Sequence, residues 1–343
     1  MPITENPTSF EIKQLAADPI RFGELTESHR RELQVHCYRI LGSIHEAEDM
    51  AQETFVKAWK RIDSYEGRAS FRAWLYKIAT NTCLDFLDSK RSRRLLPPQQ
   101  APASDPHTIL PPAAEATWLE PIPDSMLEDF NAIDPEAHYT ESESISLAFL
   151  TALQILPPRQ RAVLILRDVL DFSAIESADV LEITVSSVNS LLHRARQSLK
   201  ENYQSSQSSR LTDEKTQWLL ERYVRAWRQA DVDSLVALLR WDAVVAMPPS
   251  PSWYRGRKAI AEFSTFSYFG ADGMFTGKPK DRWQLLPTHS NGSPAFAIYV
   301  RDEINRYQAF GIQVLIIQRD KIAQIINFID PTLPERFGLP AAF

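Results

Sequence analysis

Residues Asp49–Leu87 read DMAQETFVKAWKRIDSYEGRASFRAWLYKIATNTCLDFL, and the spacing of their apolar residues predicts two helices joined by a turn. Ser43 and Glu46 have the spacing of a capping box, so the first helix is expected to start there and to end near Ile62. Its polar face is typical of a solvated helix surface, and it could equally be an acidic docking surface for a partner protein. That face carries Asp49, Gln52 and Glu53, with Trp59 at its margin.

The second helix is expected to start near Ser70 and to carry two stripes. One stripe is apolar and should be buried, and it begins with Phe71. The other places an aromatic ring, a cation and an amide on the same side, which are the groups that single-stranded DNA needs for stacking, phosphate contact and base recognition. This second stripe consists of Ser70, Trp74, Lys77 and Asn81. The basic end of the helix suits phosphates, but it also suits the dipole of a helix C-terminus.

The order of these parts closely resembles region 2 of bacterial RNA polymerase sigma factors of the extracytoplasmic-function (ECF) group. The resemblance implies that the D-x-x-Q-E-T-F stretch docks on the clamp coiled coil of the β′ subunit of the polymerase core enzyme, through Asp49, Gln52, Glu53, Phe55 and Trp59. It also implies capture of the melted minus-ten promoter element. The expected DNA-binding residues are Ser70, Phe71, Arg72, Trp74, Lys77, Asn81, Lys90, Arg91, Arg93 and Arg94. This region 2 domain is expected to span residues 20–96.

A second helical domain is expected over residues 140–204, with helices at Ser142–Ile155, Pro158–Asp168, Ala174–Leu181 and Val185–Tyr203. Its last two helices would form a helix-turn-helix. The exposed side of the final helix could read base edges and hold phosphate, or it could be an ordinary polar face. The candidate DNA-binding residues there are Ser186, Ser187, Asn189, Ser190, His193, Arg194 and Arg196.

This domain resembles sigma region 4, which implies contact with the minus-thirty-five element and with the β flap of the polymerase. The sequence departs from the family in three positions. Glu182 stands where the turn usually has glycine, and Asn189 and Leu191 replace the usual basic residues of the recognition helix. A turn without glycine costs strain or a different turn geometry, and the lost cations leave the sequence preference open.

Residues 97–139 form an acidic, proline-rich linker. Ten acidic and no basic side chains occur over 97–144, whereas the whole chain has a net charge of only -6. Such a composition predicts an extended, solvated segment that buries no core and avoids DNA. Within it, ATWLEPIPDSML (Ala116–Leu127) resembles a motif of ECF factors that carry a C-terminal extension, and the resemblance implies a path toward the active-site channel of the polymerase.

Residues 211–343 should form an α+β domain with a curved antiparallel sheet. Strands are expected at Ala243–Met247, Arg282–Pro287, Pro294–Arg301, Tyr307–Ile317 and Ile322–Phe328. The stretch MPPSPSWYRGRKAIAEF resembles the SnoaL-like branch of the NTF2-like cone fold, which includes isomerases and inactive binding modules. The possible catalytic groups are Asp231, Asp233, Asp242 and His289, whereas the aromatic residues Trp241, Trp253, Tyr254 and Phe263 are expected to line the core.

The expected protein is therefore a multidomain sigma factor, with two all-α DNA-binding domains and a SnoaL-like domain as a built-in regulator that contacts both. It is expected to be cytoplasmic, to bind core polymerase and promoter DNA, and to have no catalytic activity, cofactor, metal or membrane contact. Its two cysteines and its apolar runs, none of which approaches 18 residues, agree with this expectation. Two alternatives remain: a two-module repressor, and a bifunctional protein whose cone acts on a small molecule. A cone filled by aromatic side chains would argue against the second.

Overall fold

The computed structural model describes residues 18–90, 102–111, 118–126, 144, 146–202, 213–270, 275 and 278–343. The chain divides into two compact units. The helical unit comprises Met1–Arg94 and Met126–Gln204, and the C-terminal unit comprises Leu95–Ser125 and Ser205–Phe343. The chain thus passes from the helical unit into the C-terminal unit, returns to the helical unit, and then enters the C-terminal unit again. No helix of the described residues is both long and apolar enough to cross a lipid bilayer.

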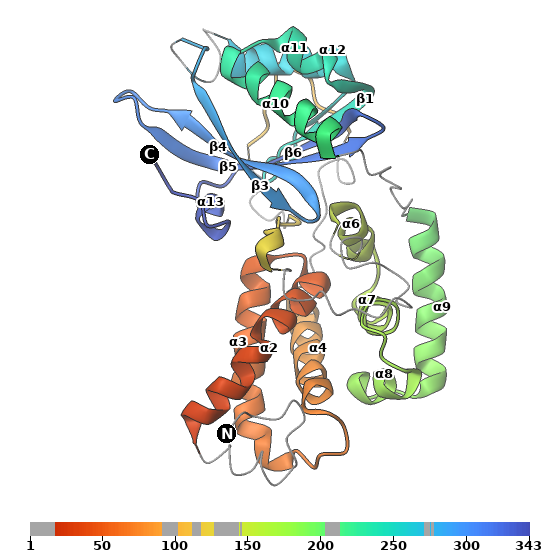
Figure 1. Cartoon of the computed structure of the whole chain (residues 1–343). Helices are drawn as coiled ribbons and strands as arrows, with labels where there is room; N and C mark the ends of the chain where they lie inside the picture. The colour runs from red at the N-terminus through yellow and green to blue at the C-terminus, as the bar shows by residue number, and fades with distance from the viewer. Residues whose placement is uncertain are drawn as a thin grey trace. The chain divides into compact units, whose positions relative to one another are not determined.

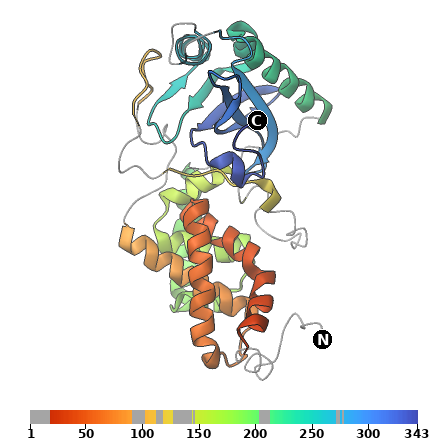
Figure 2. The same ribbon diagram turned by 90° about the vertical axis from the view of Figure 1, so that its left-hand side faces the viewer.

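Three long helices form the first part of the helical unit, and they run side by side (Figure 2). They are α2 (Pro19–Leu41), α3 (Ile44–Arg61) and α4 (Phe71–Lys90), with the short turn η1 (Ile62–Ser64) after α3. Ser43 caps α3 by accepting a hydrogen bond from the Glu46 amide, as its spacing predicts. Gly42 adopts a left-handed φ of 73°, which lets α2 end and α3 start within two residues.

The second part of the helical unit contains α6 (Leu147–Ile155), α7 (Pro158–Leu164), the π-helical turn η5 (Ile165–Val169), α8 (Ala174–Leu181) and α9 (Val185–Asn202). The predicted capping box at Ser173 and Glu176 is present. At the turn between α8 and α9, Glu182 adopts φ 54° and ψ 43°, a left-handed conformation that glycine takes without strain. The turn therefore keeps its left-handed geometry without a glycine, and the conformational strain falls on Glu182.

The two helical parts pack against each other within this unit. The buried Arg161 guanidinium of α7 donates to the carbonyl oxygen of Ile40 near the end of α2, and to the side-chain oxygen of Gln154 at 2.7 Å. Arg39 of α2 donates to the Ser144 hydroxyl at 2.9 Å, and both residues are buried. A second area of contact lies between α4 and α8. The helical unit is therefore one packed body.

The C-terminal unit contains a six-stranded sheet with the order β2-β1-β6-β5-β4-β3. The strands are β1 (Leu239–Ala246), β2 (Trp253–Arg255), β3 (Trp283–Ser290), β4 (Ser293–Arg301), β5 (Tyr307–Gln318) and β6 (Lys321–Phe328). Figure 1 shows α10 (Asp213–Gln229), α11 (Val232–Ala237) and α12 (Arg257–Ser264) together on one side of the sheet. The turn η6 (Thr265–Phe269) follows α12, and α13 (Leu333–Arg336) lies near the C-terminus.

The sheet is mixed rather than antiparallel, because β1 pairs with β6 in parallel. The expectation of a purely antiparallel sheet was therefore wrong in this pair, which joins strands far apart in the sequence. The five expected strands are present, while β2 and α12 were not predicted as separate elements. The C-terminal residues pack back on this sheet: Tyr307 and Phe343 exchange two backbone hydrogen bonds of 2.8 and 3.0 Å.

Aromatic side chains fill the space between the sheet and its helices. The Trp227 ring lies 5.3 Å from Tyr268 and 5.7 Å from Trp283, and all three are buried. Tyr223 donates a hydrogen bond of 2.5 Å to Gln313, which in turn donates to Asn327 at 2.5 Å. Trp253, Tyr254 and Phe263 are buried as expected, but Trp241 is 78% exposed, so its assignment to the core was wrong.

Two stretches of the acidic linker also belong to the C-terminal unit. We call residues 102–111 the upstream tether segment and residues 118–125, where the short helix η3 (Asp124–Met126) begins, the downstream tether segment. Trp118, Leu119 and Ile122 are 7%, 0% and 1% exposed. The expectation of a linker that buries nothing was therefore wrong for these stretches, because composition does not reveal the surface that apolar residues such as Ile122 pack on.

Candidate nucleic-acid and partner interfaces

Three of the predicted minus-ten residues of α4, namely Trp74, Lys77 and Asn81, line a cleft of about 550 Å³. The turn after α3 forms one wall, where the Tyr65 hydroxyl donates to the Ala69 carbonyl at 2.7 Å. The half-buried Trp74 ring lies 5.3 Å from the Tyr65 ring and 5.7 Å from the Phe71 ring. These contacts hold the indole at the cleft wall with part of its surface open to solvent. The cleft is also lined by Lys57, Arg61, Arg68, Asp179 and Glu182.

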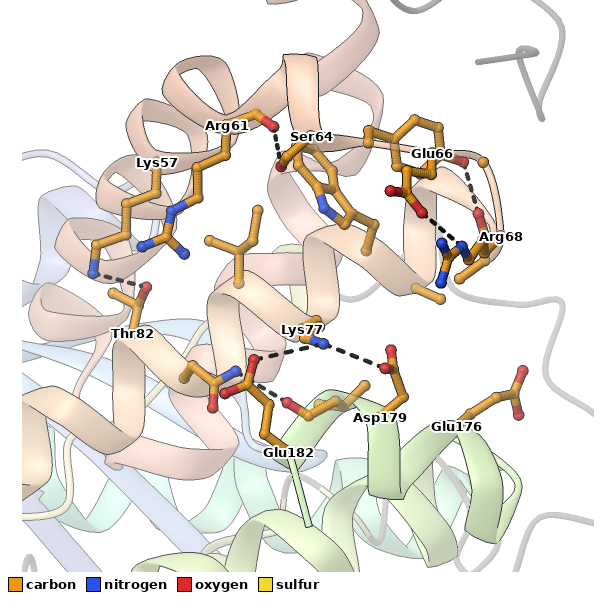
Figure 3. Close-up of a pocket in the computed structure, with 18 of the residues that line it drawn as sticks. Lys57, Arg61, Ser64, Glu66, Arg68, Lys77, Thr82, Glu176, Asp179 and Glu182 are labelled. Atoms are coloured by element: carbon orange, nitrogen blue, oxygen red, sulfur yellow. Dashed lines mark hydrogen bonds and ion pairs between the residues drawn. The ribbon is translucent and has the colours of Figure 1, made fainter. Parts of the chain in front are cut away.

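Lys77 and Asn81 are bonded to α8 of the helix-turn-helix. The Lys77 ammonium lies 3.3 Å from a carboxylate oxygen of Asp179 and 3.6 Å from one of Glu182. The Asn81 amide donates to the Val180 carbonyl oxygen at 3.0 Å. Figure 3 shows the Lys77 side chain directed toward both carboxylates. In this arrangement, the polar groups of Lys77 and Asn81 are bonded to groups of the helix-turn-helix.

Phe71 and Arg72, both predicted to contact DNA, are placed differently. Phe71 is 1% exposed and belongs to the core, so a direct contact with a base is not available to it; its ring instead supports Trp74. Arg72 forms a 2.7 Å ion pair with Glu32 of α2 and packs over Tyr76. Burial by itself would raise the pKa of Glu32, but its bonds to His29 and Arg72 hold that pKa below the usual range. Arg72 thus has a structural partner.

The predicted partner-docking face of α3 is solvent-exposed at Asp49, Gln52 and Glu53. Val56 extends this face and is 46% exposed, so it adds an apolar side chain to the polar surface. Phe55 and Trp59 are half-buried at its edge, where the Trp59 ring meets Phe22 of α2 at 5.0 Å. The polar face of α3 thus lies beside an apolar edge that is open to solvent in part.

The face of α9 predicted to bind duplex DNA is exposed at Ser186, Ser187, Asn189, Ser190, His193 and Arg194. Thr184 caps the helix by accepting a hydrogen bond from the Ser187 amide at 3.1 Å. Arg196 differs from the others, because it forms two hydrogen bonds of 2.6 and 2.9 Å to the buried Asp168 carboxylate. Arg196 therefore has a role in holding α9 to η5.

Some candidates lie outside the described residues, namely Arg91, Arg93, Arg94 and the side chain of Lys90. The fold also brings to the cleft residues that were not predicted from the sequence. Lys57 and Arg61 reach it from α3, and Lys57 donates to Thr82 of α4 at 3.2 Å. Their spacing of four residues along α3 was the available signal. Asp179 and Glu182 gave no signal in sequence, because they come from a distant helix.

The four candidate catalytic residues of the C-terminal unit each have their own local surroundings. Asp231 caps α11, because its carboxylate accepts a hydrogen bond from the Ser234 amide at 2.9 Å. The Ser234 hydroxyl also donates to this carboxylate, and the hydroxyl bond together with the amide bond lowers the pKa of Asp231. Asp242 pairs with Arg240 at 2.6 Å, which lowers its pKa as well. Asp233 and His289 are exposed. The interior is occupied by the aromatic cluster around Trp227, which argues against the small-molecule hypothesis.

Two segments of the helical unit match known protein families. Residues 25–93 match the family Sigma-70 region 2, and residues 146–199 match Sigma-70 region 4. A chain that carries both is an RNA polymerase sigma factor. It is 41% identical over 322 residues to the ECF RNA polymerase sigma factor SigG of Mycobacterium tuberculosis, covering 93% of this chain and 84% of that protein. The chain belongs to the ECF RNA polymerase sigma factors, which direct promoter-specific transcription initiation.

Two further relatives mark the extent of the similarity. The ECF sigma factor SigW of Bacillus subtilis is 30% identical over 190 residues, which span 55% of this chain and 92% of SigW. The crystal structure of SigJ of M. tuberculosis has a TM-score of 0.55 and 23% identity, and the match covers 92% of this chain and 98% of that one. The fold of most of this chain is therefore similar to that of another ECF sigma factor.

Proposed function

We propose that the cleft beside α4 receives the melted minus-ten strand, with Trp74 stacking on a base, Lys77 binding phosphate and Asn81 binding a base edge. The observation that supports this best is the indole of Trp74, which Tyr65 and Phe71 hold at 5.3 and 5.7 Å while part of it remains open. A fixed aromatic surface beside cations is the arrangement that binds single strands. Region 2 would then span residues 20–96 and region 4 residues 140–204.

The exposed face of α3, centred on Gln52, is the proposed docking surface for the clamp of the polymerase core enzyme. Its carboxylates Asp49 and Glu53 suit a basic partner, and Val56 adds apolar area. The exposed face of α9 from Ser186 to Arg194 is the proposed contact with minus-thirty-five duplex, with region 4 also meeting the β flap. The C-terminal unit is proposed to have no catalytic role and to regulate these activities, in the cytoplasm.

The minus-ten assignment is tested with Trp74→Ala and Trp74→Phe in transcription with core polymerase, on the upstream region of the gene as template. Trp74→Ala should bind core polymerase normally and lose at least tenfold in open-complex yield, while Trp74→Phe should keep most of it. Trp218→Ala is the matched control, because Trp218 is an exposed tryptophan of α10, 57% exposed. Equal open-complex yield from Trp74→Ala and Trp218→Ala would refute the assignment.

The docking face is tested separately by charge reversal at Asp49 and Glu53. We expect the double variant Asp49→Lys and Glu53→Lys to lose binding to core polymerase while its circular dichroism spectrum stays unchanged. Reversal of Asp63, an exposed acidic residue beyond the end of α3, is the control for net charge. If the double variant still binds core polymerase with wild-type affinity, the docking face lies elsewhere.

A further inference from the structure

Strand β1 of the C-terminal unit carries an exposed tryptophan on a bulge. Trp241 is 78% exposed, although Leu239 and Ala243, two positions away on either side, are buried. Leu239 and Val244 lie five positions apart on β1, but they pair with β6 residues that are only two positions apart. The unpaired residues between them form a bulge, which redirects side chains away from the face of the sheet. The bulge therefore exposes a tryptophan that regular alternation of the strand would bury.

Side chains on both sides fix the backbone of this bulge. Arg240 donates two hydrogen bonds of 2.9 and 2.6 Å to the Asp242 carboxylate, and a third to the side-chain oxygen of Gln318. Arg257 donates to the Leu239 carbonyl oxygen at 3.0 Å. The indole between Arg240 and Asp242 is thus carried on a fixed backbone, so little conformational entropy of the chain is lost when a ligand binds it.

The chain segments that meet at the bulge are basic. Residues 239–242, 253–258 and 318–321 together hold six basic and two acidic side chains, whereas the whole chain has a net charge of -6. One of the two carboxylates, that of Asp242, is already paired within the bulge. The bulge is therefore surrounded by a local excess of positive charge.

Hydrogen bonds hold these three segments side by side. The Gly256 amide donates to the Ala243 carbonyl oxygen at 2.8 Å, on the β2 side of β1. On the β6 side, the Lys321 ammonium donates to the Ala237 carbonyl oxygen at 2.8 Å. Cations therefore flank the bulge on both sides. We call its exposed residues the Trp241 patch, which consists of Trp241, Arg255, Arg257, Lys258 and Arg319.

An exposed aromatic ring among cations suits single-stranded nucleic acid, because the ring stacks on an unpaired base while the cations bind phosphates. A duplex presents only the edges of its bases in the grooves, so an indole on a protein surface gains no stacking from it. A lipid surface requires more apolar area than a single indole supplies. Transcription initiation, the activity of this family, produces single-stranded DNA when the promoter melts.

A second exposed tryptophan, Trp218 of α10, lacks this combination. It is 57% exposed, but the Arg222 guanidinium lies over its ring, 4.6 Å from the centroid, and covers one face. Residues 214–222 hold two acidic and two basic side chains, so the surroundings of Trp218 have no excess of positive charge. Trp218 therefore matches Trp241 in exposure and differs from it in the charge around the ring.

We propose that the Trp241 patch is a binding site for single-stranded DNA, in which the Trp241 indole stacks on an unpaired base and the surrounding cations bind the adjacent phosphates. This inference goes beyond the proposed function, because the site lies in the C-terminal unit and depends neither on the cleft beside α4 nor on the exposed face of α9. It gives the protein a third contact with promoter DNA, and this contact is selective for a melted strand.

The test measures how tightly the full chain binds a fluorescein-labelled oligodeoxythymidine of about 20 nucleotides, by fluorescence anisotropy. Trp74→Ala is the parent variant, because it removes the stacking surface of the cleft beside α4. In this parent, Trp241→Ala should weaken binding about tenfold, whereas Trp241→Phe should keep most of the affinity. Trp218→Ala is the matched control and should leave the affinity unchanged. The bound oligonucleotide should also slow hydrogen exchange in residues 240–243.

The cations are tested by the salt dependence of the same binding. Each phosphate neutralised on a single strand adds about 0.7 to the slope of log Kd against log salt concentration. In the same parent, we expect the double variant Arg255→Glu and Lys258→Glu to lower that slope by about one. The double variant Lys278→Glu and Lys280→Glu changes the net charge equally at exposed lysines outside the patch, and it should leave the slope unchanged.

Three results would overturn the proposal: no binding of the oligonucleotide by the Trp74→Ala parent, equal affinity of Trp241→Ala and Trp218→Ala, or equal slopes for the two double variants. These results leave the minus-ten assignment untouched, because that assignment is measured by the open-complex yield of Trp74→Ala. Normal open-complex yield from Trp74→Ala, together with loss of oligonucleotide binding in Trp241→Ala, would refute the cleft and support the Trp241 patch.

Discussion

The ammonium of Lys77 on α4 lies 3.3 Å from the carboxylate of Asp179 on α8, although 102 positions separate the two residues in the sequence. Lys77 belongs to the proposed minus-ten surface, and Asp179 belongs to the helix-turn-helix. The same contact includes Glu182 and the bond from Asn81 to the Val180 carbonyl oxygen. The helical unit thus satisfies the proposed DNA-binding groups internally, and promoter binding has to break these contacts.

Asp179→Asn should make the minus-ten surface easier to reach. The pair is partly exposed, with 28% of the Lys77 side chain and 67% of the Asp179 side chain accessible, so its contribution is at most about 1 kcal/mol. We expect the free protein to bind a single-stranded oligonucleotide from its upstream region up to about fivefold more tightly, measured by fluorescence anisotropy. Asp171→Asn makes the same charge change at another exposed site of region 4 and should have no effect. Equal gains in both variants would attribute the effect to net charge alone.

Glu182→Gly should stabilise the helical unit relative to Glu182→Gln. Both substitutions remove the carboxylate near Lys77, but only glycine relieves the left-handed conformation with φ 54°. The difference between them should be about 1 kcal/mol in the free energy of unfolding, which corresponds to a few degrees in melting temperature. Differential scanning calorimetry of the full chain measures it. A lower melting temperature for the glycine variant would show that strain at Glu182 is not limiting.

Arg161→Ala should strongly destabilise the helical unit. The Arg161 guanidinium is buried. It donates to the backbone carbonyl oxygens of Ile40 and Leu156 and to the side-chain oxygen of Gln154, so its removal takes a donor from each of these acceptors. We expect a loss of about 2–4 kcal/mol in the free energy of unfolding, measured with urea. Arg159→Ala, two positions earlier and exposed, should change it by less than about 0.5 kcal/mol. Similar effects of the two substitutions would mean that the contact with α2 contributes little.

The stability of the helical unit should fall as the pH drops below about 6.5 because of His36. Burial, with help from the nearby Arg39 and Arg72, lowers the pKa of His36 from 6.5 to about 3. Between these values the unfolded chain binds a proton that the folded chain excludes, so acid favours unfolding. The slope should reach about 1.4 kcal/mol per pH unit, and it should be clearest above pH 5, before most carboxylates titrate.

His36→Gln should remove this slope, since the glutamine amide has no titration in that range and can still bond to Thr80, which His36 contacts at 2.8 Å. His193→Gln replaces an exposed histidine of α9 and should leave the slope unchanged. Urea unfolding at pH 7.5, 6.5 and 5.5 provides the comparison. If His36→Gln keeps the wild-type slope, another group is responsible for it.

Local signals in the sequence located the elements well. Ser43 and Ser173 each start a helix, because the serine oxygen accepts a hydrogen bond from the free backbone amide three residues later. This local bond does not depend on what the helix packs against. The alternation of apolar residues likewise predicted five strands of the C-terminal sheet. The parallel pairing of β1 with β6 could not be predicted in this way, since it depends on which strand the intervening chain brings alongside.

The site was partly predictable for the same reason. Helical spacing placed Trp74, Lys77 and Asn81 on one face of α4, and it also placed Phe71 in the buried stripe, where the structure has it. Spacing could not indicate that Arg72 and Arg196 are bound to Glu32 and Asp168, because those partners lie on other helices. A charged side chain becomes a structural or a binding group according to what faces it.

The sequence by itself determined the helices, their caps, most of the strands and the family, because each depends on residues within a few turns of one another. Only the tertiary structure decided that Lys77 faces Asp179 and that Ile122 is held by Asn291, 169 positions away. Composition marked the linker as solvated because its charges and prolines cannot form a core alone. The C-terminal unit supplies the missing surface, and a contact between distant segments is specified by the shapes that both acquire on folding.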